Sequence, residues 1–154
     1  MGRLVIDEWV WEDLSGANGE IPRAEAFEFL RAVYNKCDQL VAVRPSPFVD
    51  KAHAILKKTD RTGRTIAKFV STSFLFNSIK VHFVEADSLA PLSEQAQQGV
   101  KDDDQYLVRA LTVDEVEYFV TSDGPLVTVV RGLGFSVAHR DDFVAQYIQR
   151  YGQR

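Results

Sequence analysis

The alternation of short apolar segments with helix-like stretches constrains the fold of this chain more than any other feature. Five apolar segments have the length of buried strands, namely residues 4–6, 40–43, 81–84, 118–121 and 135–138. The stretches between them carry apolar residues at helical spacing, such as Ala26, Leu30 and Val33. This pattern is typical of a parallel sheet with helices on both faces. We therefore predict a three-layer α/β/α sandwich with a mainly parallel sheet of about five strands.

Length and composition favour one ordinary globular domain over residues 1–154, since 45% of the residues are hydrophobic and 26% are charged. No apolar run approaches the roughly 20 residues that a membrane span needs. The first residues lead directly into a strand-like segment, so we expect no signal peptide. The single cysteine, Cys37, rules out an internal disulfide and a cysteine cluster for zinc. A cytoplasmic protein without membrane association is the expectation.

The central region holds the most apolar of the predicted helices. Residues 65–78 are apolar on nearly every side, which predicts one buried helix. Residues 59–64 contain Gly63 and are predicted to form the turn before it. The other predicted helices cover residues 8–14, 23–36, 48–58, 91–99, 103–113, 125–131 and 141–151.

Aspartates stand at the ends of several predicted strands or at the starts of helices. Asp7 directly follows the first strand, and Asp123 follows the fourth. Asp103 and Asp104 open the helix before the fourth strand, and Asp50 lies in the first turn after the second. In open parallel sheets ligands bind at the carboxyl ends of the strands, so these acids are expected to converge at one edge. Taken singly, Asp103, Asp104 and Asp123 also suit the role of a helix N-cap.

A convergent set of carboxylates predicts a site for Mg²⁺ or Mn²⁺, because these ions prefer hard oxygen ligands. Without a cation such acids repel one another, and some of them have raised pKa values. A divalent ion relieves the repulsion, lowers the pKa of bound water and neutralises charge on a phosphate. The chemistry predicted from the residues is therefore hydrolysis of a phosphodiester bond.

The charge of the chain is unevenly distributed, although its net value is only −4. One segment contains six basic residues and one acid, and the basic ones are Lys51, Lys57, Lys58, Arg61, Arg64 and Lys68. A basic stripe on an acidic protein can follow a phosphate backbone, which predicts contact with RNA. The alternative is a solvated helix face without a ligand.

Three stretches, 4–7, 103–111 and 118–123, resemble the PIN domain, the fold of many small bacterial and archaeal toxin ribonucleases. The end of the chain, 134–144, is similar to the last strand and helix of that family. The resemblance implies an endoribonuclease that depends on Mg²⁺ or Mn²⁺. It further implies a homodimer and, for toxin members, a small antitoxin protein that blocks the site.

The resemblance also implies roles for individual residues. Asp7 matches the first metal ligand, and Asp123 matches the fourth, with Thr121 and Ser122 as its supporting neighbours. Asp103 matches the third acid, and Asp104 is an open alternative one position along.

The second acid of the family is usually a glutamate, and Asp50 is the candidate here. Glu8 and Trp9 replace the small polar residues that usually follow the first aspartate. These departures motivate the alternative of a catalytically weak module that binds RNA or protein. A phosphatase-like or phospho-receiver domain is a third reading, but no lysine follows Asp123 as that chemistry needs.

Overall fold

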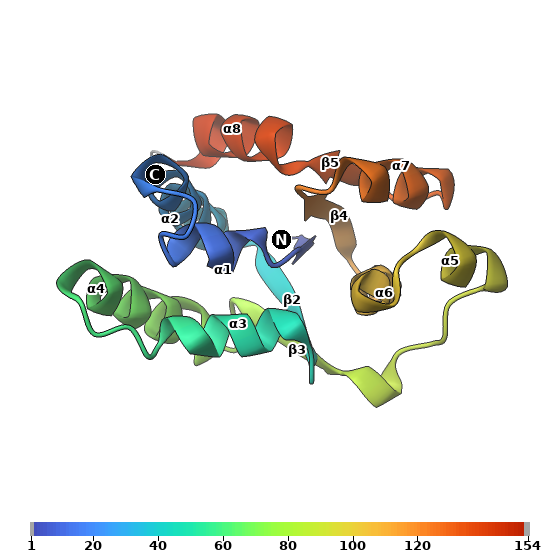
Figure 1. Ribbon diagram of the computed structural model, residues 1–154, viewed down its shortest axis with the longest axis horizontal. Helices are drawn as coiled ribbons and strands as arrows, with labels where there is room; N and C mark the ends of the chain where they lie inside the picture. Colours follow the sequence, from blue (N-terminus) through green and yellow to red (C-terminus); the bar gives the residue numbers. More distant parts are fainter. Residues whose placement is uncertain (1, 153–154) are drawn as a thin grey trace.

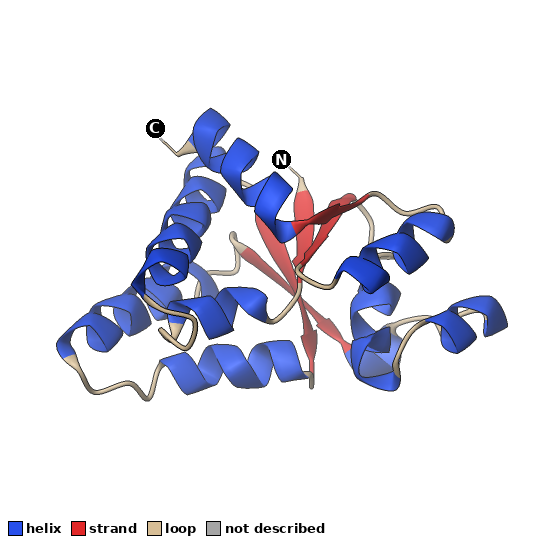
Figure 2. Cartoon of the chain, turned by 45° about the horizontal axis from the view of Figure 1, so that its top comes forward, coloured by secondary structure: helices blue, strands red, loops and turns tan. Residues whose placement is uncertain are grey.

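The computed structural model describes residues 2–152 and contains one five-stranded sheet in which every pair of neighbours is parallel. The strands are β1 (Arg3–Ile6), β2 (Gln39–Arg44), β3 (Val81–Glu85), β4 (Val116–Thr121) and β5 (Val137–His139). Their order across the sheet is β3-β2-β1-β4-β5. Helices lie on both faces of this sheet (Figure 2), which confirms the predicted three-layer α/β/α architecture.

The helices follow the order that the sequence predicts, with boundaries shifted by a few residues. They are α1 (Trp9–Leu14), α2 (Glu20–Lys36), α3 (Pro47–Ile55), α4 (Arg61–Val70), α5 (Glu94–Gly99), α6 (Gln105–Ala110), α7 (Gly124–Gly132) and α8 (Arg140–Tyr151). Short 3₁₀ turns occupy Ala86–Ser88 and Asp102–Asp104. Within residues 2–152 no helix combines the length and apolar character that crossing a bilayer requires.

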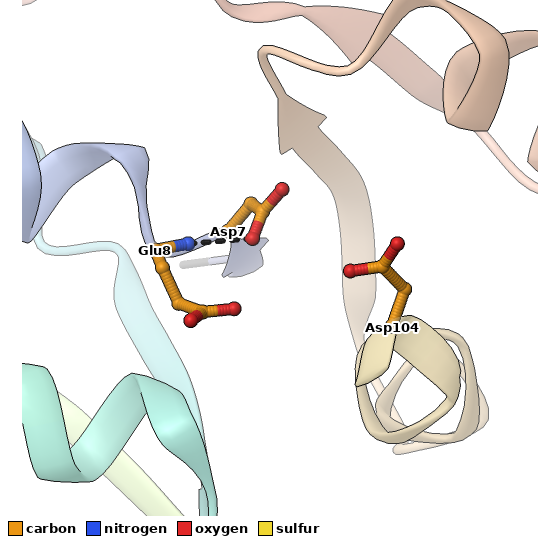
Figure 3. Close-up of side chains that lie close together, drawn as sticks. All are labelled: Asp7, Glu8 and Asp104. Atoms are coloured by element: carbon orange, nitrogen blue, oxygen red, sulfur yellow. Dashed lines mark hydrogen bonds between the residues drawn. The ribbon is translucent and has the colours of Figure 1, made fainter. Parts of the chain in front are cut away.

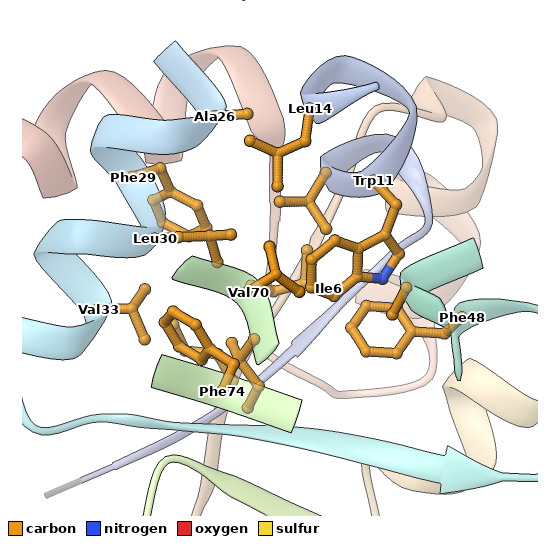
Figure 4. Close-up of a cluster of buried hydrophobic side chains, with 14 of the residues drawn as sticks. Ile6, Trp11, Leu14, Ala26, Phe29, Leu30, Val33, Phe48, Val70 and Phe74 are labelled. Atoms are coloured by element: carbon orange, nitrogen blue, oxygen red, sulfur yellow. The ribbon is translucent and has the colours of Figure 1, made fainter. Parts of the chain in front are cut away.

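Strand side chains alternate between two hydrophobic cores. Leu4 and Ile6 of β1 pack into a core with α1, α2, α3, α4 and α8, whereas Val5 packs with α6 and α7 on the other face. Figure 4 shows the first core, in which Trp11 and Phe29 fill the space between the helices. The burial of both faces explains why the strands are apolar at consecutive positions.

The prediction of one buried helix over residues 65–78 is wrong. Helix α4 begins earlier, at Arg61, because the Asp60 carboxylate accepts a hydrogen bond from Gly63 N at 3.1 Å. Only the side with Ile66 and Val70 is fully buried, and the basic residues face solvent. From Ser71 to Leu75 the chain continues as a π-helix. The apolar residues therefore mark one helix face and a separate wider turn, not a helix buried all round.

The strand order places a topological switch between β1 and β4. Strands β2 and β3 extend the sheet on one side of β1, and β4 and β5 extend it on the other (Figure 1). Ile6 at the end of β1 pairs with Val120 at the end of β4. The residues that follow these two positions therefore lie side by side where open α/β sheets bind ligands.

A buried carboxylate lies at the opposite end of the central strands, near their amino termini. Asp38, which precedes β2, is fully buried and accepts hydrogen bonds from Gly2 N at 3.0 Å and Tyr147 Oη at 2.7 Å. Lys36 Nζ lies 2.9 Å from its second oxygen and supplies the compensating charge. This network connects β1, β2 and α8.

Candidate metal-binding site

Thr121 orients the first predicted acid at the switch point. Its hydroxyl donates to Asp7 Oδ2 at 2.8 Å and accepts from the backbone N–H of Asp123 at 3.1 Å. Asp7 N in turn donates to the carbonyl of Val120 at 3.1 Å. Because Thr121 is fully buried at the end of β4, it holds the Asp7 carboxylate in a fixed direction across the two strands.

The environment of Asp7 disfavours its ionised form. Burial raises the pKa of its carboxyl group, and the hydrogen bonds from Glu8 N, at 2.6 Å, and Thr121 only partly oppose this. The nearby charges of Glu8 and Glu12 raise the pKa further. A carboxylate in this position gains from a cation placed close to it.

Glu8 lies at the start of α1 and is fixed by two other parts of the chain. Tyr106 of α6 donates its hydroxyl proton to Glu8 Oε2 at 3.1 Å, and Lys51 Nζ of α3 lies 3.1 Å from Glu8 Oε1. Burial raises the pKa of Tyr106, so this hydroxyl stays a hydrogen-bond donor. The Glu8 side chain is consequently held at the site and not turned to solvent.

Asp104 completes a set of three carboxylates from separate elements. One oxygen each from Asp7, Glu8 and Asp104 lies within 4.8 Å of the others, and we refer to these three residues as the acidic group. Figure 3 shows Asp104 at the start of α6, facing Asp7 and Glu8 at the end of β1. Burial, followed by the charges of Asp7 and Asp123, raises the pKa of Asp104. The three side chains thus share one electrostatic environment.

Two predicted aspartates have other positions. Asp103 is exposed on the 3₁₀ turn, and of the two alternatives it is Asp104 that the structure brings close to Asp7 and Glu8. Asp50 is exposed on α3 and also lies outside the group. The acidic group instead contains Glu8, the residue that sequence reasoning treated only as a departure from the family pattern. The one sequence signal for Glu8 was its position directly after Asp7.

Asp123 lies beside the acidic group and also caps a helix. Its Oδ1 accepts from Leu126 N at 3.1 Å, at the start of α7, as the N-cap interpretation predicted. Its charge contributes to the raised pKa of Asp104, which places it close enough to act on the group. Ser122 is exposed, and its carbonyl contacts His139 Nε2 at 3.1 Å.

Lys51 has a more specific place than the sequence suggested. Its ammonium contacts Glu12 at 2.6 Å and Glu8 at 3.1 Å, and these two carboxylates raise its pKa. The remaining predicted RNA-binding residues are exposed on the turn after α3 and on α4: Lys57, Lys58, Arg61, Arg64 and Lys68. Only the first member of the basic stretch therefore belongs to the acidic site.

Comparison of the sequence with protein-family models gives no match, and comparison with curated proteins gives none either. The resemblance to the PIN domain accordingly stays a hypothesis that rests on its short motifs.

The acidic group fits a divalent cation on chemical grounds. Its donors are carboxylate oxygens, which Mg²⁺ and Mn²⁺ prefer, and they approach one another closely in spite of their like charges. Two of the three have raised pKa values, as expected for acids that share a site. Within the acidic group the salt bridge of Lys51 is to Glu8.

Proposed function

We propose that this protein is an endoribonuclease that uses Mg²⁺ or Mn²⁺ to hydrolyse RNA phosphodiester bonds. The observation that carries the proposal is the approach of Asp7, Glu8 and Asp104 oxygens to within 4.8 Å at the switch point of the sheet. The PIN-like motifs of the sequence support the same chemistry. A bound cation of this class would neutralise charge on the scissile phosphate and lower the pKa of water.

The side chains around the acidic group have separate tasks in this proposal. Asp7, Glu8 and Asp104 would hold the cation, with Asp123 adding negative charge beside them. Thr121 fixes the direction of Asp7 through the hydrogen bond at 2.8 Å. Tyr106 fixes Glu8 from the opposite helix layer.

Lys51 would serve the substrate. Its ammonium lies at the edge of the acidic group, where it can accept a phosphate oxygen as a partner in addition to Glu8 and Glu12.

Cleavage of a labelled single-stranded RNA tests the proposal directly. We expect cutting in Mn²⁺ or Mg²⁺, none in EDTA, and a loss of about 100-fold or more in Asp7→Asn, on the scale of removing a group that stabilises transition-state charge. The Asp87→Asn variant, which changes an exposed acid outside the acidic group, is the matched control. Equal cleavage by Asp7→Asn and the parent would exclude this site.

A second candidate function is a PIN-like module that binds RNA or protein with little or no catalysis. The ion pair between Lys51 and Glu8 favours it, because an internal cation already compensates part of the acidic charge. Calorimetric titration with Mn²⁺ separates the two functions. Absence of binding at millimolar Mn²⁺, together with intact RNA binding, would favour the module.

A homodimer and an antitoxin partner follow only from the family resemblance and stay predictions. Sedimentation of the purified chain tests the first. A short neighbouring reading frame that encodes a DNA-binding protein would support the second.

A further inference from the structure

The carbonyl oxygen of Val120, near the end of β4, accepts two hydrogen bonds from the segment that follows β1. The backbone N–H of Asp7 donates to it at 3.1 Å, and the indole N–H of Trp9 donates to it at 3.1 Å. Glu8, the residue between these two donors, belongs with Asp7 to the acidic group. Two of the three carboxylates therefore lie on a short turn whose two ends are bonded to one oxygen of the neighbouring strand.

Further contacts hold the Trp9 ring in place. Its side chain is only 4% exposed, and its ring centroid lies 5.8 Å from that of Phe29 in α2. The guanidinium carbon of Arg140 lies 4.8 Å from the centroid of the indole. Arg140 is itself paired with Asp13 at 3.3 Å and with Glu25 at 2.7 Å. Because the ring is packed in this way, its N–H points in a fixed direction, towards β4.

The start of α1 depends on this indole hydrogen bond more than on an ordinary cap. Within residues 2–152, the side chain of Glu8 makes no capping hydrogen bond, although Glu8 is the N-cap residue of α1. Its carboxylate is instead directed to Tyr106 and Lys51, the contacts that hold it at the acidic group. The Trp9 indole thus anchors the helix start in place of a capping side chain. It also supplies a polar donor at a position where the family resemblance implies a small polar residue.

We propose that Trp9 is a positioning residue for the divalent ion. Its indole N–H, bonded to the Val120 carbonyl, keeps the turn that carries Asp7 and Glu8 in place, so that both carboxylates stay within reach of Asp104. Trp9 acts through these two acids and does not itself contact the ion. The inference deepens the proposed function and rests on it for the presence of the ion.

Trp11, two positions along the same helix, provides a matched control. It is 2% exposed and packs against Phe48 with the ring centroids 5.3 Å apart, much as Trp9 packs against Phe29. Within residues 2–152 its indole nitrogen is buried without a hydrogen-bond partner. Replacing either tryptophan by phenylalanine removes the same ring volume, but only Trp9→Phe breaks a hydrogen bond. A difference between the two variants therefore reports the N–H and not the packing.

Calorimetric titration with Mn²⁺ measures the expected effect. The affinity should fall about 10-fold or more in Trp9→Phe, on the scale known for groups that orient metal ligands, and stay within about 2-fold of the parent in Trp11→Phe. Urea unfolding without metal gives the stability of both variants. A merely structural role of Trp9 would lower stability and leave the affinity unchanged. If Trp9→Phe does not fold, 3-benzothienylalanine at position 9, which has sulfur in place of the N–H and nearly the same shape, gives the same comparison.

Amide hydrogen exchange in EDTA provides a second measure, which needs no bound ion. The backbone N–H of Asp7 shares its acceptor with the Trp9 indole. Its protection should fall about 10-fold in Trp9→Phe, because the turn is then bonded to β4 at one point and opens more readily. In Trp11→Phe the protection of the Asp7 amide should equal that of the parent.

Equal Mn²⁺ affinities of Trp9→Phe and Trp11→Phe, or unchanged exchange at the Asp7 amide, would overturn the inference. Absence of Mn²⁺ binding by the parent would also overturn it, since no metal site would then exist. A parent that binds Mn²⁺ but does not cleave RNA would contradict the proposed function alone, because the two variants still decide the role of Trp9. Conversely, RNA cleavage by the parent together with equal affinities of the variants would reject only the role of Trp9.

Discussion

The hydroxyl of Thr121 lies 2.8 Å from Asp7 Oδ2 and joins the ends of two strands that are 114 positions apart in the sequence. The Thr121 hydroxyl oxygen also accepts a hydrogen bond from the backbone N–H of Asp123 at 3.1 Å. A single buried side chain therefore organises both strand ends. The orientation of Asp7 therefore depends both on the buried location of the Thr121 side chain and on the hydrogen bonds of its hydroxyl.

Replacing Thr121 by valine keeps the shape of the side chain but removes the hydroxyl. We expect the free energy of unfolding to fall by about 2 kcal/mol, since one of the lost hydrogen bonds is to a carboxylate. Metal affinity or activity should fall about 10- to 100-fold, as for other residues that orient metal ligands. Urea unfolding and RNA cleavage measure the two effects. Thr121→Ser keeps the hydroxyl, and if it loses as much activity as valine, the orienting role is wrong.

The neighbouring aspartates Asp103 and Asp104 form a matched pair. Asp104→Asn should reduce RNA cleavage about 100-fold or more, because it removes one carboxylate of the acidic group. Asp103→Asn changes an exposed side chain and should leave cleavage within about 2-fold of the parent, as most surface substitutions alter free energies by less than 0.5 kcal/mol. The reverse order of the two effects would show that the 3₁₀ turn presents Asp103 to the site.

A second pair separates Glu8 from Asp50. Glu8→Gln removes a charge of the acidic group, so Mn²⁺ affinity measured by calorimetry should fall about 10-fold or more. Asp50→Asn alters an exposed residue outside the group and should leave the affinity unchanged. A larger effect at Asp50 would restore the position that the family resemblance implies.

The pKa values of Asp7 and Asp104 predict how stability depends on pH. Both are raised above the ordinary value of 3.8, so the folded chain binds these protons more tightly than the unfolded chain. Their contribution to stability is full below pH 3.8 and is lost as the pH rises through the raised values. In EDTA, Asp104→Asn should therefore be more stable than the parent at pH 7, and this difference should shrink towards pH 4.

Addition of a divalent ion should reverse that order at pH 7. A cation present at 100 times its dissociation constant stabilises the parent by about 2.7 kcal/mol, and the stabilisation should be much smaller in Asp104→Asn. Thermal unfolding with and without Mn²⁺ measures both effects. Identical pH profiles for the two proteins would show that Asp104 titrates normally.

The buried network of Asp38, Tyr147 and Lys36, at the amino-terminal ends of the central strands, should contribute to stability and not to cleavage. Tyr147→Phe removes the 2.7 Å hydrogen bond to Asp38 and should lower the free energy of unfolding by about 2 kcal/mol. RNA cleavage at a temperature well below unfolding should be unchanged. Asp38 lies directly before the start of β2, whereas the acidic group lies at the carboxyl ends of the strands. Urea unfolding provides the measurement, and a selective loss of cleavage without destabilisation would contradict this separation.

Much of the fold could be predicted because strands buried on both faces need uninterrupted apolar runs, and these runs are visible in the sequence. The exception was the region 65–78, where aromatic and aliphatic residues were interpreted as burial on all sides. In this region α4 buries only one narrow face of the helix. Phe76 and Ile79, which follow, are exposed to solvent although they are apolar.

The site was predictable only as far as topology determines it. Asp7 and Asp123 follow strands whose ends must be adjacent once the strand order is known. The choice of Asp104 depends on a 3₁₀ turn that sets the direction of each aspartate, and the place of Glu8 depends on Tyr106, 98 positions away. Contacts of this kind have no counterpart in local sequence patterns.

The position of β1 in the middle of the sheet also affects when the acidic group can form during synthesis. Asp7 leaves the ribosome about a hundred residues before its partners Asp104 and Thr121. Strand β1 must stay unpaired on one side until β4 has been translated. A nascent chain thus holds no assembled carboxylate cluster before β4 has been made, and any activity of the cluster begins only after that point.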